Sequence, residues 1–218
     1  MTLILGIDTS TDVCAGLSDG ASVLRSGLIA DRRAHAEKLM PLVVELLADL
    51  GRTPADLTAV VVGVGPGPFT GLRVGVAAAE VLAMALGIPI RGVGSLDAVA
   101  SQAVTETRFA GEFLVAADAR RKEVYWARYA ADGTRLDGPF VTAPDAVPAL
   151  PTIGTGADLV ASAVEGPRTL DAGHLALVGG RLPEQGLEPL YLRRPDAEVS
   201  TTRKSTLLQP RLTLRGVK

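Results

Sequence analysis

Gly63-Val64-Gly65-Pro66-Gly67-Pro68-Phe69-Thr70-Gly71 is the most distinctive stretch of this 218-residue chain. It follows a Val-rich segment, 57–64, that is typical of a buried strand, and it precedes an apolar helical segment, 71–86. A glycine-rich loop in this position can bind an anion through backbone N–H groups. It is not a P-loop, because no Gly-Lys-Ser/Thr follows and each proline removes a donor. Two interpretations stay open, a phosphate cradle or a rigid bend that aims the next helix, with Thr70 as its N-cap.

The segments around this loop alternate between strand and helix patterns. Three apolar segments separated by turns predict three antiparallel strands, at 3–7, 13–17 and 23–29. Helical periodicity follows over residues 35–50 and ends at Gly51. Beyond the second helix, residues 88–93 have the pattern of a strand, and we expect Ser95 to cap a third helix from Leu96. This half of the chain therefore predicts the order β-β-β-α-β-α-β-α.

A second group of three strands begins near Phe113. The predicted strands are 113–117, 123–129 and 134–141, and Asp132-Gly133 forms the turn between the last two. The repeated order predicts a duplicated architecture, with an N-terminal lobe at 1–104 and a C-terminal lobe at 105–195. From Arg193 onward the sequence has seven basic and two acidic residues. We expect a flexible basic tail at 196–218, for which a solvated terminus is favoured over a nucleic-acid contact.

The composition argues against several classes of site. The net charge is −2, whereas a protein that binds RNA by itself usually has a basic footprint. Cys14 is the only cysteine, which excludes an internal disulfide. His35 and His174 are far apart and no metal-ligand spacing is present, so we expect no metal site. There is no signal peptide pattern, and the apolar run 74–86 is too short to span a membrane, so we expect a cytoplasmic protein.

Asp8-Thr9-Ser10 follows the first predicted strand and has two interpretations. A carboxylate and two hydroxyls there could hold a metal-bound phosphate, or Asp8 could accept from its own backbone in an Asx-type turn, which is favoured. Asp118 lies in a polar turn that either faces a ligand or is solvated. The candidate residues of a vestigial nucleotide cleft are Asp8, Thr9, Ser10, Gly65, Gly67 and Asp118.

The helices predicted at 35–50 and 71–86 are apolar over more than one stripe. A chain of this size has a large surface relative to its volume, so burying both helices on all sides is difficult. An apolar face that stays exposed usually indicates a protein interface. We therefore expect a partner interface made of Leu39, Leu42, Val43, Leu46, Leu72, Arg73, Val76 and Glu80.

Four motifs, in this order along the chain, resemble those of one family. They are Leu5-Gly6-Ile7-Asp8-Thr9-Ser10, the loop from Gly63 continued by Leu72-Arg73-x-Gly75, Asp118-Ala119-Arg120-x-x-Glu123-Val124-Tyr125-Trp126, and Pro189-Leu190-Tyr191-Leu192-Arg193. The chain resembles the TsaB (YeaZ) family of tRNA threonylcarbamoyladenosine biosynthesis proteins. The resemblance implies an α/β fold with the two lobes of the actin, sugar-kinase and Hsp70-like ATPases. The second lobe is expected to be reduced, because residues 157–187 are fewer than the family usually has.

The resemblance also implies a function and partners. Members act as accessory scaffold subunits that bind and activate the catalytic threonylcarbamoyl transferase (TsaD-like) as a heterodimer, with a small ATPase (TsaE-like). They reach tRNA indirectly and form a homodimer when alone. The transferase has a His-x-x-x-His metal motif where this chain has Ser95 and Val99, which implies an inactive homologue.

No cofactor is then expected to bind firmly, and ATP with Mg²⁺ only weakly or through partners. The alternative is an ATP-dependent phosphotransferase or nucleotide-binding regulator of the same fold. That alternative lacks a recognisable catalytic base and a second phosphate loop in the sequence.

Overall fold

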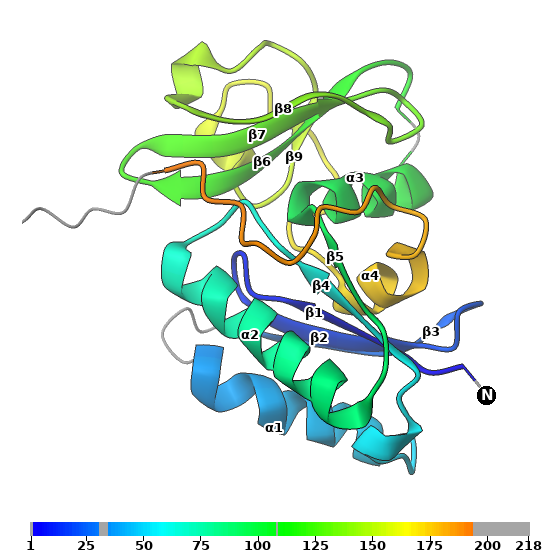
Figure 1. The fold of residues 1–218 in the computed structure, drawn as a ribbon. Coiled ribbons are helices and arrows are strands. Elements are labelled where there is room, and N and C mark those ends of the chain that lie inside the picture. The colour runs from blue at the N-terminus through cyan, green and yellow to red at the C-terminus, as the bar shows by residue number, and fades with distance from the viewer. Residues whose placement is uncertain (1, 31–34, 108, 194–218) are drawn as a thin grey trace, which may run out of the picture.

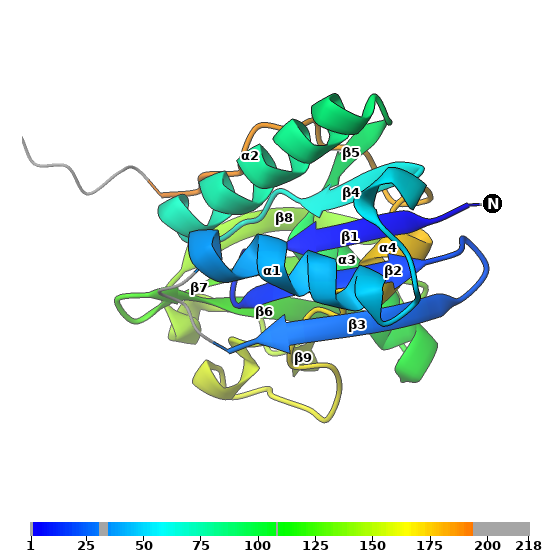
Figure 2. The same ribbon diagram turned by 90° about the horizontal axis from the view of Figure 1, so that it is seen from below.

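The computed structural model describes residues 2–30, 35–107 and 109–193, which form two mixed β-sheets lying one above the other (Figure 1). Helices α3 (Ser95–Glu106) and α4 (Ala172–Val178) lie between the sheets. Helices α1 (His35–Ala48) and α2 (Phe69–Leu86) cover the outer face of the first sheet, as the view from below shows (Figure 2).

The first sheet has the strand order β3-β2-β1-β4-β5. Its strands are β1 (Ile4–Asp8), β2 (Val13–Ser18), β3 (Val23–Ile29), β4 (Ala59–Gly63) and β5 (Ile90–Val93). The first three strands pair antiparallel, which confirms the predicted hairpins, and β1–β4 and β4–β5 pair parallel. Because β1 and β4 are parallel, their carboxyl ends lie at the same edge of the sheet. Asp8, the last residue of β1, therefore lies at the same edge as the glycine-rich loop that follows β4.

The second sheet has the strand order β8-β7-β6-β9. Its strands are β6 (Phe113–Arg120), β7 (Glu123–Tyr129), β8 (Arg135–Thr142) and β9 (Thr152–Ile153). The first three are antiparallel neighbours, and β9 pairs parallel to β6. The second sheet thus repeats the start of the first, as the sequence predicts.

The inner faces of α1 and α2 form the core of the first lobe with the sheet. Six of the eight residues expected at the partner interface are buried within the chain. Leu39, Leu42, Val43, Leu46 and Val76 belong to this core, and Leu72 is buried beside Gly65 of the glycine-rich loop. Leu42 lies against Gly27 of β3, where a Cβ would be only 2.7 Å from Leu42 Cδ1. These six side chains face the interior of the chain, which periodicity alone does not reveal because it does not say which apolar stripe faces the sheet. The partner interface itself stays a prediction. Arg73 and Glu80 are exposed.

Helix α4 packs on the opposite face of the first sheet, although its residues follow the second sheet in sequence. The close approach depends on glycine, because a Cβ on Gly6 or Gly16 would overlap the backbone of Ala172 or Gly173. Asp171 caps the helix by accepting from the N–H of Gly173 at 2.8 Å. The expected C-terminal lobe at 105–195 therefore contributes one layer of the first lobe.

The outer face of the second sheet has little cover. Two 3₁₀ helices, Pro144–Ala146 and Ala157–Leu159, pass over it, and no α-helix among the described residues does so. A third 3₁₀ helix, Pro54–Asp56, lies in the first lobe. The expectation of a reduced second lobe is confirmed in this respect.

Two helices begin earlier than expected. Pro68 is the N-cap of α2, and Gly94 is the N-cap of α3, so neither Thr70 nor Ser95 caps a helix. By length and composition α2 could cross a membrane, but its inner face packs on β4 as a core helix does. The predicted flexible tail at 196–218 lies outside the described residues.

Candidate functional site

Asp8 lies at the end of β1 in a buried hydrogen-bond network. Its Oδ1 accepts from the N–H of Ser10 at 2.7 Å and from the Ser10 hydroxyl at 2.6 Å. Its Oδ2 accepts from the Ser95 hydroxyl at 2.5 Å. The Asx-type turn is confirmed, and both carboxylate oxygens bond within the chain.

Ser95 joins this network to the glycine-rich loop. Its hydroxyl oxygen accepts from the backbone N–H of Gly65 at 3.0 Å while its hydrogen goes to Asp8. The backbone N–H of Ser95 donates to the carbonyl of Gly65 at 2.8 Å. The N–H of Gly65, a donor that a phosphate cradle would use, is thus taken by a side chain. Sequence reasoning missed this role of Ser95.

The glycines of the loop allow it to pack directly on the Asp8-Thr9-Ser10 turn. A Cβ on Gly63 would overlap Asp8 Oδ2, and a Cβ on Gly67 would lie 2.6 Å from the carbonyl oxygen of Ser10. A Cβ on Gly75 of α2 would overlap Thr9 Oγ1, and the Thr9 hydroxyl donates to the carbonyl of Gly71 at 2.8 Å. This packing favours the rigid bend over the phosphate cradle.

Burial raises the pKa of the Asp8 carboxyl above its ordinary value, although the hydrogen bonds from Ser10 and Ser95 oppose the shift. A carboxylate that binds Mg²⁺ must be ionised and must present a free oxygen. Asp8 is fully enclosed and its oxygens are engaged. These residues do not fit a metal-bound phosphate in this arrangement.

The cavity beside Ser10 and Ser95 is also too small for a nucleotide. A cavity of about 20 Å³ lies there, lined by residues that include Ser10, Ser95, Thr155 and Arg168. Ligand pockets usually have roughly 300 Å³ or more. Asp118 does not line this cavity. Its carboxylate accepts from the N–H of Arg120 at 2.8 Å in the turn between β6 and β7.

A second glycine-containing loop, Gly154-Thr155-Gly156, follows β9 beside the cavity. The sequence signal was a Gly-x-Gly after a short apolar segment, and sequence reasoning missed it. Here too the glycines serve packing, because a Cβ on Gly154 would overlap Ala116 O and one on Gly156 would lie 2.7 Å from Ala117 C. The Thr155 hydroxyl is buried and has no hydrogen-bond partner among the described residues. The cavity it faces has room for about one water molecule.

No three His, Cys, Asp or Glu side chains cluster among the residues that the structure describes. His174 is largely buried in α4, and its Nε2 lies 3.2 Å from the Ser101 hydroxyl. Burial lowers the pKa of His174, although Asp171 and Glu106 oppose the shift. Val99 is a core residue.

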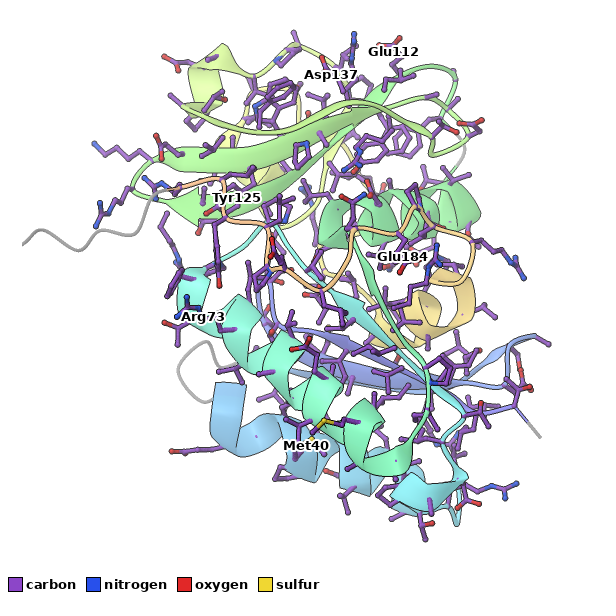
Figure 3. The ribbon with its side chains drawn as sticks, in the orientation of Figure 1. Met40, Arg73, Glu112, Tyr125, Asp137 and Glu184 are labelled. Atoms are coloured by element: carbon purple, nitrogen blue, oxygen red, sulfur yellow. The ribbon has the colours of Figure 1, made fainter. Side chains whose placement is uncertain are left out.

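The outer helical face is an apolar feature of the first lobe that stays exposed. We define it as Val44, Ala77, Glu80, Val81 and Met84, all of them exposed side chains of α1 and α2 that point away from the sheet. The exposed fractions are 52% for Val44, 59% for Val81 and 78% for Met84. Residues 77, 80, 81 and 84 share one side of α2 by their spacing. Met40 lies where the two helices meet (Figure 3).

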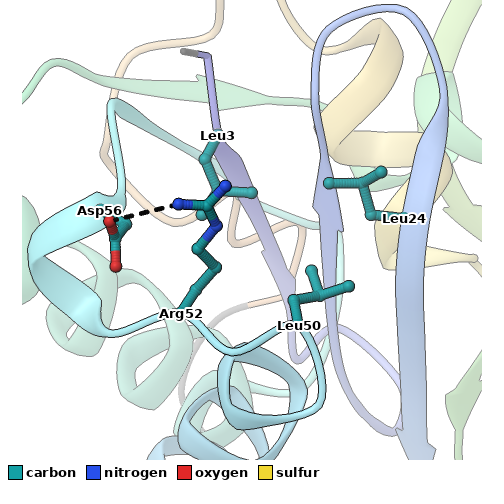
Figure 4. A pocket seen from close by; sticks show the side chains of 5 residues that line it. All are labelled: Leu3, Leu24, Leu50, Arg52 and Asp56. Carbon is teal, nitrogen blue, oxygen red and sulfur yellow. Dashed lines mark ion pairs between the residues drawn. The ribbon is translucent and has the colours of Figure 1, made fainter.

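A separate pocket of about 320 Å³ lies near the end of α1 (Figure 4). Leu3, Leu24 and Leu50 form its apolar wall, and the ion pair of Arg52 with Asp56, at 3.7 Å, closes one side. None of the cleft residues predicted from the sequence lines it.

Comparison with known proteins connects this geometry to a family. The family model described as TsaD, tRNA N6-adenosine threonylcarbamoyltransferase, matches residues 29–166. The uncharacterized protein Rv3421c of Mycobacterium tuberculosis is 48% identical over 207 residues, which cover 91% of this chain and 95% of that protein. The Escherichia coli tRNA threonylcarbamoyladenosine biosynthesis protein TsaB is 36% identical over 129 residues, 59% of this chain and 55% of that protein. The match thus spans little more than half of the E. coli protein.

A solved structure agrees over a longer range. YeaZ from Pseudomonas aeruginosa superimposes with a TM-score of 0.70 at 28% identity, covering 88% of this chain and all of that chain. The similarity covers most of the chain, so the predicted α/β fold with two lobes is confirmed. Together with the motifs at Asp8, Gly63, Asp118 and Pro189, these findings show that the chain belongs to the TsaB (YeaZ) family, within the wider group that the threonylcarbamoyltransferase model describes.

Proposed function

We propose that the chain is an accessory subunit in the synthesis of N6-threonylcarbamoyladenosine in tRNA, and that it binds and activates the catalytic threonylcarbamoyl transferase. The relatives indicate the pathway, since TsaB of E. coli and TsaB of Bacillus subtilis are both named tRNA threonylcarbamoyladenosine biosynthesis proteins. Because this chain belongs to the same family, we assign it to the same pathway. The geometry supports an accessory role in that pathway.

The observation that carries the proposed role is the outer helical face. Three apolar side chains of this face, Val44, Val81 and Met84, are exposed to water. Covering them with another protein is favourable, because it removes apolar surface from water. Ala77 is exposed beside them and lets a partner helix approach closely. This face replaces the interface residues expected from the sequence, of which Glu80 remains. The transferase binds here, and a second copy of the chain occupies the same face when the transferase is absent.

The proposed role is non-catalytic. Ser95 and Val99 stand where the transferase has its metal-binding histidines, and neither side chain supports such a site. Asp8, the other chemically competent group, is held by Ser10 and Ser95. In this proposal the chain uses no nucleotide or metal of its own, and a small ATPase partner supplies nucleotide-driven steps.

Reconstitution with purified components tests the proposal. The transferase, the small ATPase and this chain would be combined with unmodified tRNA and threonylcarbamoyl-adenylate, and modified nucleoside would be measured by mass spectrometry. We expect no product from this chain alone, little from the other two proteins, and full activity from all three. Product formation by this chain alone would contradict the non-catalytic role. Full activity without the chain would contradict the accessory role.

A further inference from the structure

A groove of about 500 Å³ lies beside α3, which Figure 1 shows between the second sheet and α4. Helix α3 contributes Asp97, Ser101 and Thr105, which share one side of the helix because they are four residues apart. The turn 132–135 between β7 and β8 and the segment 181–183 after α4 complete the lining. Three parts of the chain that are distant in sequence therefore meet at this groove, which we call the α3 groove.

Contacts within the chain hold both of these other parts in place. Gly133 of the β7–β8 turn has a φ angle of 84°, and a Cβ there would lie 3.2 Å from Val104 Cγ2, so the turn packs directly on α3. On the other side, Arg91 of β5 donates through Nη2 to the carbonyl of Leu182 at 2.8 Å. The α3 groove is thus formed by the fold itself, as ligand sites usually are.

Asp97 is the buried charge of the α3 groove, with only 3% of its surface exposed. Its Oδ1 accepts from the Tyr129 hydroxyl at 2.8 Å. Its Oδ2 lies 3.5 Å from Arg135 Nη1 and has no hydrogen-bond partner among the described residues. Burial raises the pKa of the Asp97 carboxyl, although Arg135 and Tyr129 oppose the shift, so these two partners do not fully compensate the buried charge. A carboxylate oxygen in this state can accept a further donor.

Two guanidinium groups of the α3 groove have unused donors. Within the described part of the chain, Arg135 forms the ion pair with Asp97 but no hydrogen bond, and its side chain is 23% exposed. Arg181 is exposed, and its side chain has neither an ion pair nor a hydrogen bond with another described residue. A guanidinium group presents its N–H donors in a planar fork that matches a carboxylate. The α3 groove can therefore bind the carboxylate of a ligand.

The charges of the α3 groove balance one another. Arg135 and Arg181 are matched by Asp97 and by Asp132, an exposed residue whose carboxylate accepts from the N–H of Thr134 at 2.9 Å. A polyanion would be repelled by the two carboxylates, and an uncharged apolar ligand would remove charged groups from water without pairing them. A small molecule that carries both signs of charge fits this arrangement best.

We propose that the α3 groove binds a free α-amino acid. The carboxylate of the amino acid pairs with Arg181 and Arg135, and its ammonium group donates to Oδ2 of Asp97. Because Arg135 has no hydrogen bond to Asp97, turning its guanidinium group toward the ligand breaks only a long ion pair and gives access to Oδ2.

The apolar part of the lining, Val104, Leu182 and Pro183, receives the side chain of the amino acid. The α3 groove shares no residue with the outer helical face or with the hydrogen-bond network of Asp8, so this binding goes beyond the proposed function. The proposed function supplies only the choice of the first probe, L-threonine, because threonylcarbamoyladenosine contains a threonyl group.

The test is an NMR titration of the isotope-labelled full-length chain with L-threonine and then with each other standard amino acid. Backbone amide signals report both the place of binding and the affinity. Two analogues separate the charges of the ligand: L-threoninol lacks the carboxylate, and N-acetyl-L-threonine lacks the ammonium group. If another amino acid binds, its own alcohol and N-acetyl derivatives are used.

We expect binding with a Kd between about 10 μM and 1 mM, which is reasonable for a ligand with so few atoms. The signals of Ser101, Gly133 and Leu182, which belong to the three parts of the α3 groove, should shift. Both analogues should bind at least about tenfold more weakly, because each leaves one set of charged groups unpaired.

Variants of the chain test the two ends of the ligand separately. Arg181→Gln removes an exposed guanidinium group and should weaken binding about tenfold. Arg25→Gln on β3, an exposed arginine outside the α3 groove, is the matched control and should change the affinity by less than about twofold. Asp97→Asn keeps the acceptor for Tyr129 and should also weaken binding about tenfold. Thermal unfolding shows whether each variant is folded, and if Asp97→Asn is not, Arg181→Gln decides.

The proposal would be overturned if no standard amino acid bound, or if binding shifted only signals outside the α3 groove. Equal affinities of Arg181→Gln and Arg25→Gln, or analogues that bind as tightly as the amino acid itself, would overturn it as well. In each of these cases, reconstituted tRNA modification that depends on the chain would leave the proposed function standing. Amino-acid binding at the α3 groove without that activity would support the groove and contradict the proposed function alone.

Discussion

The hydroxyl of Ser95 donates to Oδ2 of Asp8 over 2.5 Å, although 87 residues of sequence separate them. The bond joins the end of β1 to the first residue of α3, and the same hydroxyl oxygen accepts from Gly65 of the glycine-rich loop. The Asp8-Thr9-Ser10 turn, considered from the sequence as a phosphate site, is here an internal connection between three elements. The contact explains why an intact Asp-Thr-Ser motif need not bind a nucleotide.

Replacing Asp8 with Asn should change how stability depends on pH. Burial raises the pKa of Asp8 in the folded chain above its ordinary value of about 3.9 in the unfolded chain. The folded state therefore binds the Asp8 proton more tightly than the unfolded state does. The protonated carboxyl contributes fully to stability below the pKa of the unfolded state, and this contribution is lost as the pH rises through the higher pKa of the folded state. Each pH unit between the two values changes the free energy of unfolding by at most about 1.4 kcal/mol.

Urea unfolding at a series of pH values from about 3.5 to 7 measures this effect. We expect the unaltered chain to lose stability relative to Asp8→Asn over this range. Asp97, whose pKa is also raised by burial, is present in both proteins and cancels in the difference. Parallel curves for the two proteins would show that Asp8 titrates normally.

Gly75→Ala should destabilise the fold, even though alanine is favoured over glycine inside a helix by about 1 kcal/mol. The added Cβ would overlap Thr9 Oγ1 and push α2 away from the Asp8-Thr9-Ser10 turn. We expect a net loss of about 1–3 kcal/mol in chemical unfolding. Gly180→Ala is the control, because a Cβ there meets open space. A stabilised Gly75→Ala protein would mean that the loop and the turn are not tightly packed.

The two sides of α1 should respond differently to truncation. Leu42 is buried against Gly27 and the sheet, whereas Val44 is exposed. Leu42→Ala should cost about 2–5 kcal/mol in the free energy of unfolding, and Val44→Ala less than about 0.5 kcal/mol. Denaturant titrations of the isolated chain measure both. Similar small losses for both variants would place Leu42 at the surface and restore the interface first expected from the sequence.

Much of the fold could be predicted because local patterns determine it. The alternation of turns and apolar segments gave the antiparallel strands β1–β3 and β6–β8 with small errors at their ends. The periodicity of 35–50 and 71–86 identified both long helices. It did not identify their buried sides, because α1 and α2 are apolar on more than one stripe. One apolar stripe of each helix packs on the sheet. Only the apolar side chains outside that stripe, such as Val81 and Met84, stay exposed and can contact a partner.

The parts that escaped prediction depend on contacts between distant residues. Ser95 looked like a helix cap, and its true partners, Asp8 and Gly65, are far from it in sequence. Helix α4 has only a short, weak pattern, and it forms where Gly6 and Gly16 of the first sheet leave room for its backbone. No local signal reports such a close approach.

If the outer helical face binds the transferase, Met84→Glu should weaken the complex, because it places a charge in the middle of that face. Met84 is 78% exposed, so the charge should leave the free energy of unfolding within about 0.5 kcal/mol of the unaltered value. Leu136→Glu on β8, where Leu136 is 46% exposed, is the matched control on the second lobe. The measurement is the dissociation constant of the purified chain and transferase by calorimetry. We expect Met84→Glu to weaken binding by at least about tenfold and Leu136→Glu to leave it unchanged. Equal affinity of the Met84→Glu protein and the unaltered chain would show that the transferase does not bind the outer helical face.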